Sequence, residues 1–211
     1  MRVLTENMGI CCVLTGPSGV GKDDVMKPII TDLGFRQVLT RTSRKMRAGE
    51  VHMVDYDFVS LECFLKGVDD KEFLEHFEHR PGEYKGTPKE VLRPVFEGDN
   101  IMWRIDPVAA ARSKDLVVEK MQEEGIRLAK RMVTVYIAPS DWGDIEARYF
   151  RRDPNANREV FYAGFERDKR EWAELKHRFD WVVINAEGRL ADTVQFVKQI
   201  LTEEIRVRNR I

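Results

Sequence analysis

The sequence has no long hydrophobic run, few cysteines and almost no net charge. No apolar stretch reaches the roughly 20 residues of a membrane span, and the first residues, MRVLTENMG, lack the apolar core of a secretory signal. Three cysteines, two of them adjacent, do not suggest a disulfide framework. The 35 basic and 36 acidic residues leave a formal charge of -1, unlike a protein that binds nucleic-acid backbones. These absences predict a cytoplasmic protein with no membrane or nucleic-acid partner.

What is present indicates an α/β fold. The 211 residues are enough for one packed domain with a small inserted lobe. Short apolar runs alternate with helical segments, which predicts a parallel sheet with helices on both faces. The expected buried strands are GICCVLT, IMWRID, MVTVYIA and FDWVVIN. The expected helices are 22–33, with Pro28 as a point of kinking, 107–124, 140–151, 157–177 and 189–203.

The sequence pattern changes between residues 35 and 91, where short stretches of alternating apolar and polar residues are separated by glycine and proline. This segment is predicted to form a small mixed or antiparallel lobe, inserted into a core made of 1–34 and 92–211. RRDPNAN has turn chemistry between two predicted helices, so about 148–160 is a candidate lid.

The string GPSGVGK follows a predicted buried strand and precedes a predicted helix, as a phosphate-binding loop does. Its glycines let backbone N–H groups turn toward a phosphate, and the helix start adds positive potential. A chance glycine-rich turn is the alternative, and the strand–loop–helix context argues against it. The predicted ATP-binding residues are Gly16, Pro17, Ser18, Gly19, Val20, Gly21, Lys22 and Asp23.

Asp23 occupies the position where the loop pattern has a Mg²⁺-binding hydroxyl. A carboxylate is a hard oxygen donor that suits Mg²⁺, so Asp23 is the candidate metal ligand. Alternatively, Asp23 and Asp24 only favour the start of the helix, and nucleotide binding is weakened or lost. We favour a working site, because Lys22 and the glycines would otherwise have no evident purpose.

Arg41, Arg44, Lys45 and Arg47 lie within seven positions of the predicted lobe. Such a run is usually a solvated face. Downstream of a phosphate loop, however, arginine forks suit a second phosphate, which a phosphoryl-transfer enzyme must also align.

At this point the chain resembles the guanylate kinase family. The likeness rests on GPSGVGK, SRKMRAGEVHMVDYDFVS, EFLEHFEHRPGEYKGTP and FDWVVINAEGRLADT, in the family's order and spacing, from about residue 10 to 203. It implies transfer of the ATP γ-phosphoryl group to GMP or dGMP, with Mg²⁺. The implied GMP-binding residues are Thr40, Arg44, Arg47, Tyr56, Glu75, Tyr84, Thr87 and Asp106.

Within that set, the resemblance gives Arg44, Arg47, Tyr56 and Tyr84 to the phosphate and Glu75 to the guanine edge. Guanine N1 and N2 are both donors, so a carboxylate suits them; taken alone, Glu75 would be read as an exposed strand acid. The implied catalytic residues are Lys22, Arg44, Arg148 and Arg152. The last two are four apart on one helix face, where the alternative is a pair of solvated arginines.

Several positions depart from the family pattern. Asp23 replaces a hydroxyl residue, Lys85 stands where a second tyrosine is usual, and Arg104 stands where an acid is usual. The loss of that acid and the gain of Asp23 suggest a metal ligand moved from strand end to loop. A later lid arginine is missing near residues 163–164, with Arg158 or Arg167 as substitutes, and Pro107 and residues 109–110 also differ.

Three functions therefore remain open. The first is a kinase acting on GMP, working as a monomer or homodimer. The second is a related kinase with another acceptor, such as ribose 1,5-bisphosphate, because a Lys-Asp pair after the loop glycines resembles that group. The third is a guanylate-kinase-like binding domain with impaired catalysis.

Overall fold

Two sheets organise the chain, which the computed structural model describes over residues 8–209. The larger is a five-stranded parallel sheet in the order β2-β7-β1-β8-β9. Its strands are β2 (Arg36–Gln37), β7 (Ile101–Arg104), β1 (Cys11–Thr15), β8 (Met132–Pro139) and β9 (Trp181–Asn185). The α/β fold with a parallel sheet is thus confirmed, and all four expected strands are present.

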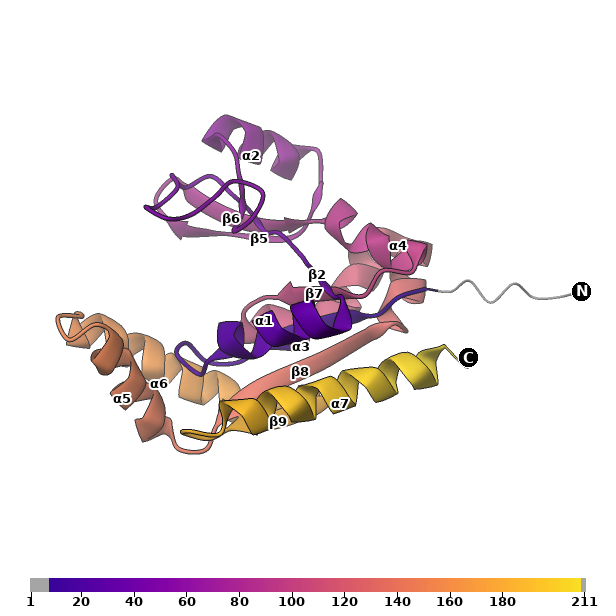
Figure 1. The fold of residues 1–211 in the computed structure, drawn as a ribbon. Coiled ribbons are helices and arrows are strands. Elements are labelled where there is room, and N and C mark those ends of the chain that lie inside the picture. The colour runs from indigo at the N-terminus through magenta and orange to yellow at the C-terminus, as the bar shows by residue number, and fades with distance from the viewer. Residues whose placement is uncertain (1–7, 210–211) are drawn as a thin grey trace, which may run out of the picture.

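Helices cover both faces of this sheet (Figure 1). They are α1 (Lys22–Leu33), α3 (Pro107–Ala111), α4 (Ser113–Ala129), α5 (Trp142–Arg152), α6 (Arg158–Leu175) and α7 (Leu190–Arg208), with a short 3-10 turn η2 (Lys176–Arg178). Pro28 lies inside α1, which continues past it to Leu33. The expected single helix over 107–124 is wrong. Asp106 caps a short α3, α4 begins at Ser113, and Gln122 interrupts α4 with a φ of 54°.

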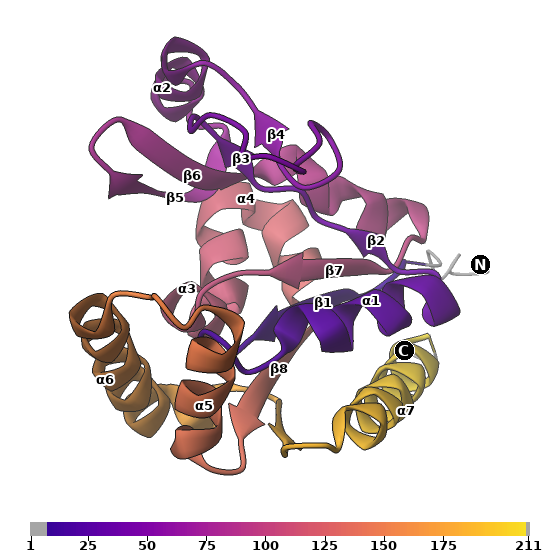
Figure 2. The ribbon, with the colours of Figure 1, turned by 60° about the vertical axis from the view of Figure 1, so that its left-hand side comes forward.

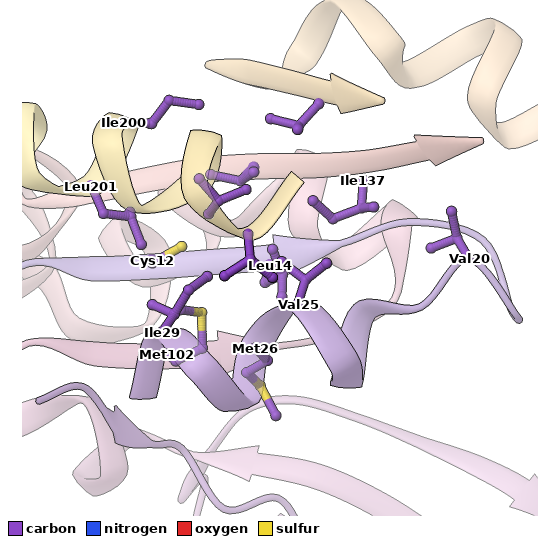
Figure 3. Close-up of a cluster of buried hydrophobic side chains, with 14 of the residues drawn as sticks. Cys12, Leu14, Val20, Val25, Met26, Ile29, Met102, Ile137, Ile200 and Leu201 are labelled. Carbon is purple, nitrogen blue, oxygen red and sulfur yellow. The ribbon is translucent and has the colours of Figure 1, made fainter. Parts of the chain in front are cut away.

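Side chains of β1 alternate between two cores, as expected for a strand buried on both faces. Cys12 and Leu14 pack with α1 and α7, whereas Cys11 and Val13 pack on the opposite side with Trp103. Figure 3 shows the first of these cores, in which apolar side chains fill the space between β1 and the two helices. The packed sheet fixes the end of β1, from which the glycine-rich loop departs.

The second sheet forms the predicted lobe (Figure 2). It is mixed, in the order β4-β3-β6-β5, with β3 parallel to β4 and the other pairs antiparallel. Its elements are β3 (Arg41–Thr42), β4 (Asp57–Phe58), α2 (Leu61–Asp69), β5 (Phe73–Arg80), β6 (Glu83–Pro88) and the following 3-10 helix η1 (Lys89–Glu97). Residues 36–38 instead extend the parallel sheet, because they pair with β7, so the mixed sheet begins only at Arg41.

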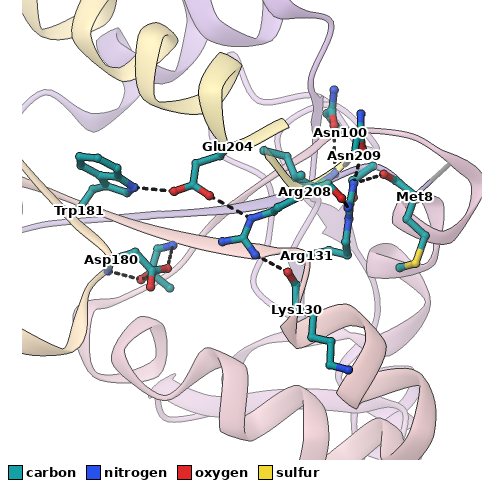
Figure 4. Close-up of polar contacts among 12 residues, drawn as sticks. Met8, Asn100, Lys130, Arg131, Asp180, Trp181, Glu204, Arg208 and Asn209 are labelled. Carbon is teal, nitrogen blue, oxygen red and sulfur yellow. Dashed lines mark hydrogen bonds and ion pairs between the residues drawn. The ribbon is translucent and has the colours of Figure 1, made fainter. Parts of the chain in front are cut away.

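The C-terminal helix is tied to the start of the chain by polar contacts (Figure 4). Arg131, which follows α4, donates to the carbonyls of Met8, Gly9 and Arg208 and, over 2.7 Å, to Oδ1 of Asn209. One side chain thereby joins both ends of the described chain to the edge of the core.

Replacing Arg131 with alanine is expected to lower the free energy of unfolding by about 2–4 kcal/mol, because three backbone carbonyls lose their donors. Chemical denaturation measures the change. The matched control is Arg93→Ala, which removes an exposed pair with Glu124 and should cost less than about 1 kcal/mol. Equal losses in the two variants would contradict the anchoring role of Arg131.

Candidate active site

The loop between β1 and α1 is shaped by three glycines. Gly16, Gly19 and Gly21 have φ of 145°, 81° and 93°, in the region that side chains disfavour. A Cβ at Gly16 would lie 2.2 Å from the carbonyl oxygen of Ile137, and one at Gly21 would lie 2.9 Å from Nδ2 of Asn185. The loop therefore presses closely on β8 and β9, and its path depends on glycine.

Lys22 opens α1 and folds back over this loop. Its Nζ donates to the carbonyls of Gly16 and Pro17, both at 2.8 Å. Burial lowers the Lys22 pKa to about 8, the charge of Arg104 acts in the same direction, and Asp23 and Asp168 oppose it. An anion arriving at the loop would favour the charged form of Lys22.

Asp23 and Arg104 meet across the start of α1. Oδ1 of Asp23 lies 2.9 Å from Nη1 of Arg104, which ends β7 directly beside β1. The two departures noted in the sequence are therefore in contact, and each offsets the charge of the other. Whether a metal ligand moved between these positions is a separate prediction.

Two clefts meet at this point. One, of about 480 Å³, lies over the loop and is lined by α1, α5 and the segment after β9. The other, of about 810 Å³, lies between the lobe, α3 and α6. Ser18, Lys22 and Arg104 line both clefts. A group that passes from one cleft to the other would pass these three residues.

A hydrogen-bonded chain fixes Glu75 in the larger cleft. The Thr87 hydroxyl donates to Oε1 of Glu75 at 2.6 Å and accepts from the indole N–H of Trp103 at 3.2 Å. Trp103 is fully buried on β7, so the chain runs from the parallel sheet into the lobe. Burial raises the Glu75 pKa, Thr87 partly offsets this, and Asp106 adds to the rise.

Tyr56 and Lys85 face each other in the same cleft. Nζ of Lys85 lies 3.5 Å from the Tyr56 hydroxyl and 4.8 Å from the ring centre. Burial acts to raise the Tyr56 pKa, but the charges of Lys85, Arg104 and Arg44 outweigh it and lower the pKa. The positive potential around this hydroxyl suits a bound anion.

Arg44 is buried behind Tyr56. It makes a bidentate pair with Glu50, at 2.6 and 2.5 Å, and its guanidinium lies 5.1 Å from the centre of the Tyr56 ring. Its Nε is buried without a hydrogen-bond partner among the described residues. Arg47 is exposed, and its backbone N–H donates to the same Glu50 carboxylate. Neither arginine lines either cleft in this conformation.

The end of α5 reaches the smaller cleft through Arg148 and Arg151. Nε of Arg148 lies 2.6 Å from Oε2 of Glu187, and Nη1 of Arg151 lies 3.3 Å from Oε1 of that carboxylate. The Arg152 side chain lies outside the described residues. Asp168 of α6 reaches the loop itself, where its Oδ2 accepts the backbone N–H of Ser18 at 2.9 Å.

A family model described as Guanylate kinase matches residues 9–204. This chain belongs to the guanylate kinase family. It is 32% identical over 194 residues to "Guanylate kinase 2, chloroplastic/mitochondrial" of Oryza sativa subsp. japonica, a match that covers 91% of this chain and 63% of the rice protein. It thus spans less than two thirds of that relative's length.

A second relative, the guanylate kinase of Enterococcus faecalis, is 32% identical over 201 residues, which cover 93% of this chain and 89% of the bacterial protein. The crystal structure of guanylate kinase from Anaplasma phagocytophilum superposes with a TM-score of 0.64 at 22% identity, covering 94% of this chain and 87% of that one. That likeness supports the fold.

Against this guanylate kinase background, most expected acceptor-side residues come together. Thr40, Tyr56, Glu75 and Asp106 line the larger cleft, with Thr87 directly behind Glu75. Asp106 also caps α3, accepting the N–H groups of residues 108 and 109 at 3.0 Å.

The expectation for Tyr84 is wrong in placement. Its ring lies 5.6 Å from that of Phe64, on the α2 side of the lobe sheet. Successive residues of a strand point to opposite faces, so Lys85 and Thr87 face the cleft instead. Lys85, which the sequence marks as a departure that could still bind phosphate as a cation, is the β6 cation that lines this cleft.

Sequence reasoning missed Asp168 and the Trp103 link, and no local signal marks either, because both contacts join residues far apart in the chain. Of the two proposed substitutes for the missing lid arginine, Arg167 lines the larger cleft. Arg158 instead lies 4.5 Å from the Phe150 ring centre and lines neither cleft.

Replacing Glu187 with glutamine is expected to tighten ATP binding by about twofold to fivefold, because the carboxylate that pairs with Arg148 and Arg151 would no longer compete with phosphates for them. Titration calorimetry measures the dissociation constant. Glu174→Gln, an exposed acid on α6, is the control and should leave it unchanged. Weaker binding in Glu187→Gln would mean that this carboxylate supports the site.

Proposed function

We propose that this chain transfers the γ-phosphoryl group of ATP to GMP or dGMP, giving ADP and GDP or dGDP. The observation that carries the proposal is the meeting of two clefts at Lys22, with the Glu75 carboxylate fixed in the larger one. Membership of the guanylate kinase family supports the same reaction. It does not favour a different acceptor or a purely binding role.

In this proposal ATP occupies the smaller cleft. Residues 16–22 wrap the donor phosphates, Lys22 exchanges its two carbonyl partners for phosphate oxygens, and the N-terminus of α1 adds favourable potential. Asn185 supports the loop from below, since its Nδ2 donates to the carbonyl of Val20 at 2.7 Å. The nucleotide thus binds to a loop that is already shaped.

GMP occupies the larger cleft. Glu75 accepts from the N–H groups of guanine, with Thr40, Thr87 and Asp106 around the base, and Tyr56 and Lys85 receive the phosphate. Arg44 and Arg47 complete the phosphate site only after a movement of their loop, because Arg44 is at present paired with Glu50. Lobe closure on the acceptor is the motion that this requires.

In the transfer step, an oxygen of the GMP phosphate bonds to the γ-phosphorus, and the bond from that phosphorus to the β,γ-bridging oxygen breaks. The electron pair of the broken bond leaves with ADP, and no covalent enzyme intermediate forms. Catalysis is therefore positioning and charge stabilisation. Lys22, Arg44, Arg148 and Arg152 supply positive charge, the last two as the lid at about 148–160 closes.

Mg²⁺ fits this site as a companion of ATP. The candidate ligand is Asp23. Its Oδ1 is paired with Arg104, so Oδ2 is the oxygen that would bind the metal. Mg²⁺ is commonly held by one or two carboxylates together with substrate phosphates, and Asp23 meets that need. Bound there, the metal would neutralise part of the triphosphate charge. The side chains that the structure describes include no cluster of three or more acidic, histidine or cysteine residues suited to a metal.

We further propose that 35–91 acts as the GMP-binding lobe on a core formed by 1–34 and 92–211. A cytoplasmic location, and a monomer or homodimer, stay predictions of the sequence. No helix within the described residues has the length and apolar character needed to cross a bilayer.

The test is an assay of ADP release with Mg²⁺-ATP and each nucleoside monophosphate in turn, with ribose 1,5-bisphosphate as a further acceptor. Release with GMP and dGMP is expected. Release only with another acceptor would overturn the role of Glu75. No release with any acceptor, with GMP still bound in calorimetry, would assign the chain a binding role.

A further inference from the structure

We propose that Arg104 binds the phosphoryl group as it passes between the clefts, and that Asp23 is the positioning residue that holds Arg104 there. The inference rests on the proposed function and adds a cation that the loop motif does not contain. Among the described side chains, Arg104 is one of three that line both clefts, together with Ser18 and Lys22.

The backbone fixes where Arg104 can reach. It ends β7 and pairs in register with Leu14, so it lies beside the point where β1 turns into the loop. The strand thus delivers a guanidinium to the carboxyl edge of the parallel sheet, where ligands of such folds bind. Its side chain keeps 33% of its surface exposed, which leaves it accessible to a ligand.

Arg104 is electrostatically close to both substrates' sites. On the donor side it lines the cleft beside Lys22 and is paired with Asp23. It also contributes to the lowered pKa of Tyr56 on the acceptor side, where burial opposes it and Lys85 acts first in the same direction. One cation therefore acts on groups of both clefts, as stabilisation of a migrating negative charge requires.

Asp23 gives this cation a fixed direction. The contact from Nη1 to Oδ1 is 2.9 Å, and a guanidinium carries five N–H donors in a planar fork, so donors remain for a phosphate. Asp23 is itself anchored in the first turn of α1, next to Lys22. The pair also cancels the carboxylate charge that would otherwise face the triphosphate.

The first test compares ATP with ADP, because only ATP carries the group in transfer. Arg104→Gln is expected to weaken ATP binding by about tenfold while ADP binding changes less than about twofold. The turnover number for GMP should fall by about a hundredfold or more. Arg36→Gln, an exposed arginine of β2, is the control and should alter neither.

Unchanged discrimination between ATP and ADP, with turnover within about threefold of the wild type, would overturn the role of Arg104. Arg104→Lys, which keeps the charge, should recover part of the preference for ATP. That recovery, together with an unchanged midpoint of thermal unfolding in Arg104→Gln, would show that the loss is not caused by misfolding. If wild-type protein lacks GMP kinase activity but Arg104→Gln still loses its preference for ATP, the proposed function fails, while binding of the γ-phosphoryl group by Arg104 stands.

The second test is a double-mutant cycle with Asp23→Asn. At saturating Mg²⁺, Asp23→Asn alone should lower the turnover number by about tenfold with little change in the KM for GMP, and it should lower the turnover of Arg104→Gln much less than that of the wild type. Asp23→Glu should restore part of the turnover. Additive effects, or an Asp23→Asn defect that excess Mg²⁺ fully repairs, would overturn the positioning role and leave Asp23 as a metal ligand alone.

Discussion

Replacing Glu75 with glutamine is expected to lower kcat/KM for GMP by about two to three orders of magnitude, the largest change in base recognition that one substitution should cause. The carboxylate offers two acceptors to guanine donors, whereas an amide offers one acceptor and one donor. The Thr87 hydroxyl keeps its partner in either case, so the strand geometry is retained. Steady-state rates with GMP, dGMP and AMP measure the effect.

Two controls isolate base recognition from other causes. ATP affinity should be unchanged in Glu75→Gln, and Glu62→Gln, an exposed acid in the first turn of α2, should behave as wild type. Because burial raises the Glu75 pKa, GMP affinity in the wild type should fall in mildly acid solution as this carboxyl takes up a proton. The glutamine variant should lack that dependence. If GMP affinity of the variant fell in acid solution as much as that of the wild type, Glu75 would not be the group that titrates, and its role in binding guanine would be wrong.

Replacing Lys22 with methionine is expected to lower kcat/KM by about a thousandfold, because a charge-assisted contact to the transferring group is lost. The buried ammonium of Lys22 should also make ATP affinity of the wild type depend on pH. Its pKa of about 8 in the free protein must rise when a polyanion binds, so binding above pH 8 takes up a proton. ATP affinity should therefore fall as pH rises beyond about 8, and this group adds no dependence below it.

Calorimetry in buffers of different ionisation enthalpy counts the proton taken up. Lys22→Arg keeps its charge throughout this range and should bind ATP with no alkaline loss. Lys27→Met, an exposed lysine on α1, is the matched control and should leave the dependence intact. An alkaline limb that survives in Lys22→Arg would assign the titration to another group.

Much of the parallel core was predictable, because its signals are local. A buried run such as CCVLT, followed by a glycine-rich turn and a helix start, specifies strand, loop and α1 from neighbouring residues alone. The break between α3 and α4 was not predictable in the same way. No proline or glycine lies between residues 107 and 113, and the break coincides with tertiary packing in which Ala110 and Ser113 are buried.

The site residues were predictable where a sequence motif fixes their position. They were less predictable where their place depends on which face of a strand they occupy or on contacts between residues far apart in the sequence. Tyr84 and Thr87 were both assigned to the GMP site, yet they are three apart on one strand and so point to opposite faces. Strand alternation, applied strictly, would have selected Lys85. The contact between Asp168 and the loop joins residues 150 apart, and that between Asp23 and Arg104 depends on strand order, which one sequence does not state.

The link from Trp103 through Thr87 to Glu75 limits how far the lobe is a self-contained module. A designer who moved residues 35–91 onto another phosphate-loop scaffold would carry over Glu75 and Thr87. The indole that holds the threonine would stay behind on β7. Such a chimera would keep the carboxylate but not its preorganised orientation. With Glu75 in its proposed role, we expect base selectivity to be transferable only with two elements together, the lobe and strand β7.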